Sequence, residues 1–178
     1  MSEISFEDRT VIVTGAGNGL GKAYAIELGN RGAKVVVNDL GGAVDGSGSG
    51  STPADEVVNE IIANGGEAVA NYDSVATKDG GEAIVQTAID SFGTVDAVIN
   101  NAGILRDKSF AKLSEEELSL VIDVHLKGTF FVSQPAFRVM KEKNYGRIVN
   151  VASPSGLFGN FGQSNYGAAK MAVSYTHL

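Results

Sequence analysis

Residues 10–21 read TVIVTGAGNGLG, and the architecture of the chain can be worked out from them. The apolar run Val11–Val13 is typical of a buried strand, and the glycines after it indicate a tight turn into a helix that starts near Gly19. Such a helix directs its free N–H groups and its positive dipole end at the turn, where a pyrophosphate fits. With Asp39 about 20 residues further on, the pattern is typical of a dinucleotide-binding βαβ unit.

The residues around this turn are the first candidate cofactor ligands. They are Gly15, Asn18, Gly19, Leu20 and Gly21. Asp39 closes the second expected strand, where a carboxylate can accept both hydroxyls of an adenosine ribose and would repel a 2′-phosphate. Because neither Arg nor Lys stands at Leu40, Asn18 or Asn38, the sequence favours NAD over NADP.

The composition is that of an ordinary globular protein. Of the 178 residues, 43% are apolar and 20% are charged, and the net charge is -7. This acidic balance argues against a nucleic acid or an anionic membrane as the main partner, because both require a basic face. The sequence has no cysteine and two histidines, so it offers no metal cluster, and it shows neither a signal peptide nor a membrane-length apolar run. We therefore expect one domain over residues 1–178.

Expected strands and helices alternate along the whole chain. The strands are Val11–Thr14, Lys34–Asn38, Glu67–Asn71, Val95–Asn100 and Arg147–Val151. The helices are Leu20–Arg31, Pro53–Asn64, Thr77–Phe92, Glu115–Lys141 and Gln163–Val173, and the fourth opens on a capping box formed by Ser114 and Glu117. This alternation predicts an α/β protein, a three-layer Rossmann fold with a doubly wound parallel sheet.

The segment Leu40–Thr52 is rich in glycine and serine. Its composition favours a flexible surface loop, and a lid near the cofactor is the alternative.

Polar residues also follow the third and fourth expected strands. Asp73 and Ser74 could bond the edge of the adenine, or could simply cap the next turn. Asn100, Ala102 and Gly103 follow the fourth strand, where small residues would let the chain lie along the cofactor. We count all five as candidate cofactor ligands.

Three residues near the end of the chain could carry chemistry. Tyr166 and Lys170 are four apart on an expected helix and therefore share a face. A free phenol, with a pKa of about 10, is a poor base at neutral pH, but a nearby ammonium group favours the phenolate. Ser153 follows the fifth strand, at the sheet edge where open α/β sheets bind ligands, so its hydroxyl can hold a substrate oxygen beside the phenol.

Together these pieces resemble the short-chain dehydrogenase/reductase family. The matching features are TGAGNGLG at 14–21, Asp39, NNAG at 100–103, Ser153, Tyr166 and Lys170, with the family's spacing between the last three. The resemblance covers nearly the whole chain. It implies that Tyr166 is the acid/base, that Lys170 lowers its pKa and holds the nicotinamide ribose, and that Ser153 orients the substrate oxygen.

Several longer stretches are similar to one subgroup, the (3R)-hydroxyacyl-CoA dehydrogenase unit of peroxisomal multifunctional enzyme type 2 and its bacterial relatives. They are VVVNDLGGA, ANYDSV, NNAGILRD, VHLKGTF and LFGNFGQSNY. This resemblance implies NAD-linked oxidation of a 3-hydroxyacyl-CoA to the 3-oxoacyl-CoA, in peroxisomes if the source is eukaryotic and in the cytoplasm if it is bacterial. The alternatives are a 3-oxoacyl-thioester reductase of fatty-acid synthesis, against which Asp39 speaks, and an inactive nucleotide-binding module.

His125 stands where many members of the family have an asparagine that supports a proton relay. A lone helical histidine is more often a packing residue, but its expected place under the active site makes it a fourth catalytic candidate.

The end of the sequence departs from the family. Family members are longer, and residues 174–178, SYTHL, no longer resemble them. The expectation is a form truncated in the catalytic helix, lacking the last strands and the substrate lid and therefore inactive by itself. When full length, the resemblance implies a homodimer through the helices at 115–141 and 163–173.

Overall fold

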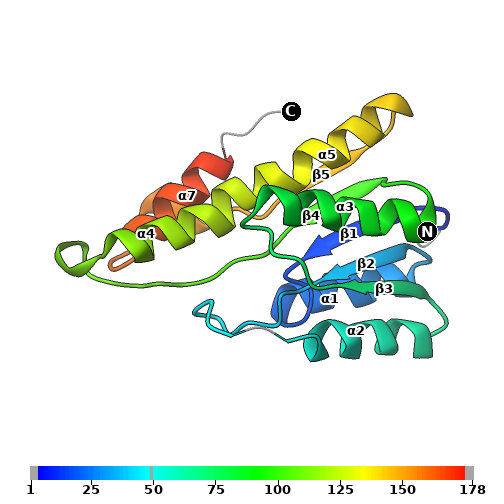
Figure 1. The fold of residues 1–178 in the computed structure, drawn as a ribbon, viewed down its shortest axis with the longest axis horizontal. Coiled ribbons are helices and arrows are strands. Elements are labelled where there is room, and N and C mark those ends of the chain that lie inside the picture. Colours follow the sequence, from blue (N-terminus) through cyan, green and yellow to red (C-terminus); the bar gives the residue numbers. More distant parts are fainter. Residues whose placement is uncertain (1–3, 49, 175–178) are drawn as a thin grey trace.

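A five-stranded parallel sheet forms the centre of the computed structural model, which describes residues 4–48 and 50–174 (Figure 1). Its strands are β1 (Thr10–Thr14), β2 (Lys34–Asn38), β3 (Glu67–Asn71), β4 (Ala97–Asn100) and β5 (Arg147–Asn150). They lie in the order β3-β2-β1-β4-β5, and every neighbouring pair is parallel. The chain builds outward from β1 to β3 and then returns to place β4 on the other side of β1. This reversal confirms the Rossmann fold and predicts a ligand crevice at the carboxyl ends of β1 and β4.

Helices cover both faces of the sheet, which explains the unbroken apolar runs of β1 and β2. On one face, Val11, Val13 and Val35 pack with residues of α1 (Gly19–Asn30) and α2 (Thr52–Ala63). On the other, Ile12 and Val36 pack with residues of α3 (Lys78–Phe92) and α5 (Gly128–Glu142). The two apolar clusters thus take alternate residues of each strand, as the two-residue period of a strand requires.

The predicted long helix is interrupted by a π-helical turn. It consists of α4 (Glu115–Ile122), the π segment η2 (Asp123–Lys127) and α5. The predicted capping box is present, with the Ser114 hydroxyl accepting from the Glu117 amide at 3.1 Å and the Glu117 carboxylate accepting from the Ser114 amide at 3.1 Å. Single π turns inside helices occur often at functional sites, and this one carries His125.

The sequence patterns did not predict two short helices. They are η1 (Phe110–Lys112) and α6 (Pro154–Phe158), each too short for a helical period to show. The last helix, α7 (Ser164–Ser174), matches the prediction within a residue. Ser174 of the SYTHL tail still belongs to α7 and bonds the Lys170 carbonyl at 2.9 Å, whereas residues 175–178 lie outside the described part of the chain.

One edge of the sheet is open in the described structure. There β5 pairs with β4 alone, and Val149 is 49% exposed. In residues 4–48 and 50–174, the helices are all too short or too polar to cross a bilayer.

Candidate active site

A cleft of about 480 Å³ lies where the fold predicts it, at the carboxyl ends of the strands. Eight of the predicted cofactor ligands line it: Gly15, Asn18, Gly19, Asp39, Asp73, Ser74, Ala102 and Gly103. The other five, Leu20, Gly21, Asn100, Tyr166 and Lys170, do not belong to its lining. Leu20 is 63% exposed, Gly21 is buried against the turn, and Asn100 is buried behind the sheet edge.

The glycine turn is shaped by close backbone approaches. Gly15 has φ +62, and a Cβ added there would lie 2.7 Å from the Cα of Ala102. A Cβ at Gly21 would lie 2.1 Å from the Gly15 carbonyl oxygen, so this residue lets the start of α1 pack on the turn. Gly19 begins α1 with open space around it, which leaves the helix N-terminus accessible to an anion.

Asp39 is held in place by two backbone amides. Its Oδ2 accepts from the Gly17 amide and its Oδ1 from the Gly41 amide, each at 2.7 Å. Each carboxylate oxygen keeps a further acceptor site for a ribose hydroxyl. None of the described lining residues is Lys or Arg, and Asp73 is a second carboxylate in the lining. The described lining therefore presents carboxylates and no cation to a ligand.

The glycine- and serine-rich segment runs along this cleft. Residues 42–44 and Gly46 line it, the Val44 carbonyl accepts from the Leu105 amide at 2.9 Å, and a Cβ at Gly46 would touch the Ile104 side chain. The segment is thus a surface loop without helix or strand over residues 40–48, and contacts with residues after β4 place it beside the cleft, where the alternative interpretation put it.

The two asparagines at the end of β4, Asn100 within the strand and Asn101 directly after it, have structural bonds. Asn100 Nδ2 donates to Ser133 Oγ at 2.8 Å and to Asn150 Oδ1 at 2.9 Å, which ties β4 to α5 and β5. Its side-chain amide therefore points into the protein, and this side chain does not support the prediction of Asn100 as a cofactor ligand. Asn101, which the candidate set omitted, lines the cleft, and its Nδ2 donates to the carbonyls of Thr14 and Gly15 at 3.0 Å each. The signal in the sequence that could have identified Asn101 is its place in the NNAG segment, which packs against the glycine turn.

Ser153, Tyr166 and Lys170 all follow β5, the first at the start of α6 and the other two on α7, and these two helices contact each other. Ser153 is the N-cap of α6, where its hydroxyl accepts from the Ser155 amide at 3.2 Å. Lys170 lies on α7 and is only 5% exposed; its Nζ donates to the Val151 carbonyl at 2.6 Å and lies 5.9 Å from the centre of the Tyr166 ring. Burial lowers the pKa of Lys170 to about 8, so the ammonium form still dominates at neutral pH.

His125 is the fourth predicted catalytic residue, and it packs directly against Tyr166. The two rings meet edge to face, with centroids 5.0 Å apart and an interplanar angle of 87°. His125 Nε2 lies 3.1 Å from the Ile104 amide nitrogen and 2.8 Å from the Ile104 carbonyl oxygen. Burial, and secondarily the charge of Lys170, lowers the pKa of His125 to about 4.

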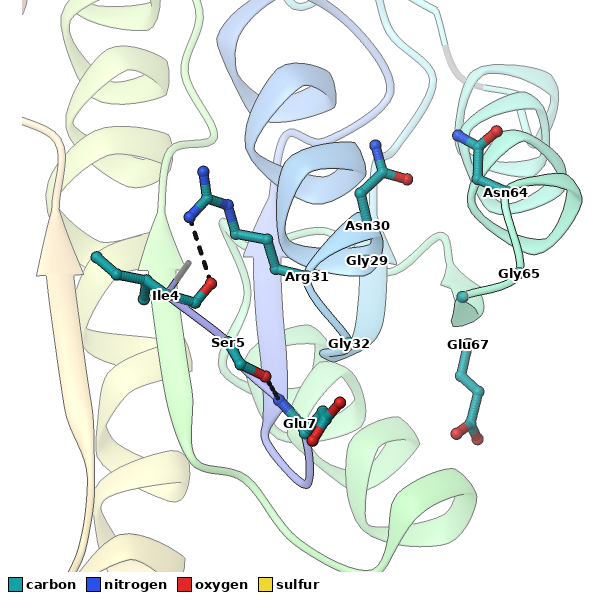
Figure 2. Close-up of a pocket in the computed structure, with 11 residues that line it drawn as sticks. Ile4, Ser5, Glu7, Gly29, Asn30, Arg31, Gly32, Asn64, Gly65 and Glu67 are labelled. Atoms are coloured by element: carbon teal, nitrogen blue, oxygen red, sulfur yellow. Dashed lines mark hydrogen bonds between the residues drawn. The ribbon is translucent and has the colours of Figure 1, made fainter. Parts of the chain in front are cut away.

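A second cleft, of about 380 Å³, lies at the amino ends of the strands (Figure 2). Its one cationic side chain among the described lining residues is Arg31, which bonds Glu27 at 2.6 Å and the Ile4 carbonyl at 3.3 Å. None of the predicted site residues reaches this cleft, and open α/β sheets bind ligands at the opposite edge.

Comparison with known proteins agrees with the family resemblance of the sequence motifs. The family described as short chain dehydrogenase matches residues 9–176. The chain belongs to the short-chain dehydrogenase family. Its members are oxidoreductases that use NAD or NADP. The fold and the predicted resemblance are thereby confirmed.

Individual relatives of this short-chain dehydrogenase are similar over nearly all of its length. It is 60% identical over 170 residues to the peroxisomal hydratase-dehydrogenase-epimerase of Saccharomyces cerevisiae, covering 96% of this chain and 19% of that protein. It is 55% identical over 172 residues to peroxisomal multifunctional enzyme type 2 of Mus musculus, covering 97% and 23%. The crystal structure of a short chain dehydrogenase from Mycobacterium avium superposes with a TM-score of 0.86 at 47% identity, covering 94% and 60%. The chain thus spans only part of each of these relatives.

Proposed function

We propose that the protein carrying this chain oxidises a 3-hydroxyacyl-CoA to the 3-oxoacyl-CoA with NAD. The observation that carries the proposal is the buried Lys170 beside Tyr166, whose ring packs on His125, which in turn contacts Ile104 in the lining of the cleft. The dehydrogenase in the name of the yeast relative, and the identity to it, support the type of reaction, and the subgroup resemblance of the sequence supports the substrate class.

The chain's own residues would divide the work as follows. Ser153 is placed to hold the substrate oxygen with its hydroxyl, and the Tyr166 phenolate to take the proton from the 3-hydroxyl group. The Lys170 ammonium lies beside the phenol ring, where a positive charge stabilises the phenolate. NAD, when bound, supplies the acceptor for the hydride that leaves carbon 3. Asp39 would hold the adenosine ribose, and the glycine turn with the start of α1 the pyrophosphate.

A homodimer is the proposed assembly of the full-length protein. The apolar residues that the sequence of the helix at 115–141 offers for it are Leu118, Val121, Ile122, Phe130 and Phe131. The structure leaves Leu118 40% and Phe130 48% exposed, but it buries Val121 completely. Val121 packs into the chain's own interior and so cannot contact a partner, whereas Phe137, 43% exposed on α5, can. A monomer in light scattering across micromolar concentrations would contradict this proposal.

The yeast and mouse relatives are named as peroxisomal, which supports a peroxisomal location if the source is eukaryotic, with the cytoplasm proposed if it is bacterial.

The test is a pair of assays on the full-length protein. NAD with a 3-hydroxyacyl-CoA should give NADH, and Tyr166→Phe should reduce the rate at least a hundredfold, within the range typical of a general base. Tyr145→Phe is the matched control, because Tyr145 packs against Arg9, 4.2 Å from its ring centre, at the other end of the sheet and should keep its rate. Faster reduction of a 3-oxoacyl thioester with NADPH would favour the reductase of fatty-acid synthesis, and NADH binding without turnover of either substrate would favour a nucleotide-binding module.

A further inference from the structure

We infer that His125 is a positioning residue that fixes the cleft wall at Ile104 against the ring of Tyr166. The inference rests on the proposed function, because it assigns His125 a task in the same site. It also sets aside the proton relay that the sequence left open for this residue.

His125 joins two parts of the site that come from distant stretches of sequence. Gly103 and Ile104 line the cofactor cleft, and Tyr166 stands on α7. The imidazole contacts Ile104 through Nε2 and Tyr166 through its ring. The contact with the wall is close, since a Cβ added at Gly103 would lie 2.4 Å from His125 Cε1.

Ile104 also connects the wall to the segment that runs along the cleft. A Cβ at Gly46 would lie 3.1 Å from Ile104 Cδ1, and the next amide, that of Leu105, bonds the Val44 carbonyl. A displacement of Ile104 would therefore move both sides of the cleft. The hydrogen bond from His125, which is only 3% exposed, restrains Ile104 against such a displacement.

The hydrogen-bond geometry indicates which tautomer does this. Nε2 lies within reach of both the amide and the carbonyl of Ile104, but it can serve only one of them at a time. Nδ1 is buried and has no hydrogen-bond partner among the described residues. A buried acceptor without a partner is tolerated better than a buried N–H without one, so we assign the proton to Nε2, donating to the carbonyl at 2.8 Å.

The same surroundings argue against proton transfer through the ring. A relay needs a partner on each nitrogen, and Nδ1 lacks one in the part of the chain that is described. The charged group that acts on the ring from α7 is the Lys170 ammonium, which opposes a second positive charge, and Tyr166 presents its ring. On η2 itself, Asp123 and Lys127 pair with each other at 2.7 Å.

Two substitutions separate the two contacts of His125. His125→Phe keeps an aromatic ring beside Tyr166 and removes the hydrogen bond to Ile104. We expect it to raise the Kd for NADH about tenfold while kcat and its pH profile stay close to wild type. His125→Gln keeps an amide that can reach Ile104 and removes the ring. We expect it to keep the Kd within about twofold and to lower kcat about five- to tenfold, because Tyr166 loses its packing partner.

Thr129→Val is the matched control. The Thr129 hydroxyl donates to the backbone carbonyl of His125 at 2.8 Å, so this variant disturbs the same helical turn and leaves the imidazole intact. Kd and kcat should stay within about twofold of wild type. Equal losses in Thr129→Val and His125→Phe would show that the helix, and not the imidazole, positions the site, and would overturn the inference.

The ring itself can be observed by nitrogen NMR, which needs no activity. The chain has two histidines, so the spectrum of His125→Phe, or of His125→Gln should the former fail to fold, assigns the signals. We expect the Nε2–H tautomer and a ring that stays neutral down to about pH 5. An Nδ1–H tautomer, titration near the ordinary histidine value, or loss of one limb of the pH–kcat profile in both variants would overturn the inference in favour of a relay. If wild type shows no dehydrogenase activity, the proposed function fails, whereas the NADH affinities and the tautomer still decide the role of His125.

Discussion

The burial of His125 makes the stability of this protein depend on pH. Its pKa is about 4 in the folded chain, against 6.5 for an ordinary histidine. Between these values the unfolded chain binds a proton that the folded chain does not, so the contribution is complete above pH 6.5 and is lost as the pH falls toward 4. The loss amounts to about 3 kcal/mol. Urea unfolding between pH 7 and pH 4 should show a slope that His125→Phe flattens by this amount; parallel curves for the two proteins would contradict it.

Asp39 governs the predicted choice between the two nicotinamide cofactors. Replacing it with alanine removes the charge that would repel a 2′-phosphate, and arginine at Leu40, which also lines the cleft, supplies an attractive one. Asp39→Ala with Leu40→Arg should therefore shift the ratio of kcat/KM for NAD and NADP toward NADP by at least about a hundredfold.

Leu40→Arg alone is the control for this pair, because it keeps the two amide bonds that Asp39 makes with Gly17 and Gly41. It should shift the ratio less than the pair does. Equal use of both cofactors by the unsubstituted protein would refute the assignment.

At single positions, the sequence predicted where a residue lies when the surrounding strand or helix pattern was clear, while the roles of these residues stay predictions. Asp39 after a strand, or Tyr166 and Lys170 on one helical face, are such cases, and the structure brings them to the expected edge of the sheet. The sequence did not decide between Asn100 and Asn101, because either of two adjacent asparagines could face the cleft. Their difference depends on the pleat of β4 and on partners such as Ser133, which lies 33 residues away in the sequence.

Among the elements, the glycine turn between β1 and α1 is tightly constrained. Gly15→Ala combines a left-handed φ of +62 with a contact of 2.7 Å to Ala102, so it should lower the free energy of unfolding by about 3 kcal/mol or more and abolish NADH binding. Gly65→Ala is the matched control, because Gly65 has φ +87 and nothing within 4 Å of an added Cβ. It should cost about 1 kcal/mol and leave NADH binding unchanged. Thermal melting and NADH titration measure both variants.

The regular elements were predictable because their patterns are local. Apolar runs, the capping box at Ser114 and the proline that opens α2 each fix an end within a few residues. The π turn η2 was not predictable, because its sequence, DVHLK, continues the helical pattern. The extra residue in that turn is stabilised by tertiary contacts, above all those of His125 with Ile104 and Tyr166, which no helical period reports.

At the scale of the whole molecule, the residues expected to bind the cofactor and those expected to carry the chemistry lie in different parts of the fold. The second group lies beyond β5, whose outer edge is open in the described structure. The cleft proposed to bind the cofactor is lined mostly by residues that follow β1 to β4, and it is present in the described chain. Tyr166 stands on α7 beyond β5, where Val149 is half exposed and no further strand pairs among the described residues. The 178 residues cover 60% of the Mycobacterium avium dehydrogenase, so that protein contains much more chain than this cleft requires.

We therefore expect the 178 residues by themselves to bind NADH weakly and to show no measurable oxidation of a 3-hydroxyacyl-CoA. Hydride transfer needs the reacting atoms within about 3–3.5 Å, and a displacement of about 1 Å can cost roughly a hundredfold in rate. Joining these residues to the C-terminal region of the Mycobacterium avium protein should restore turnover and raise the melting temperature, since the edge of β5 and α7 would then gain partners. Turnover by the 178 residues alone, at a rate close to that of the joined protein, would show that β5 and α7 already hold Ser153, Tyr166 and Lys170 firmly enough for catalysis.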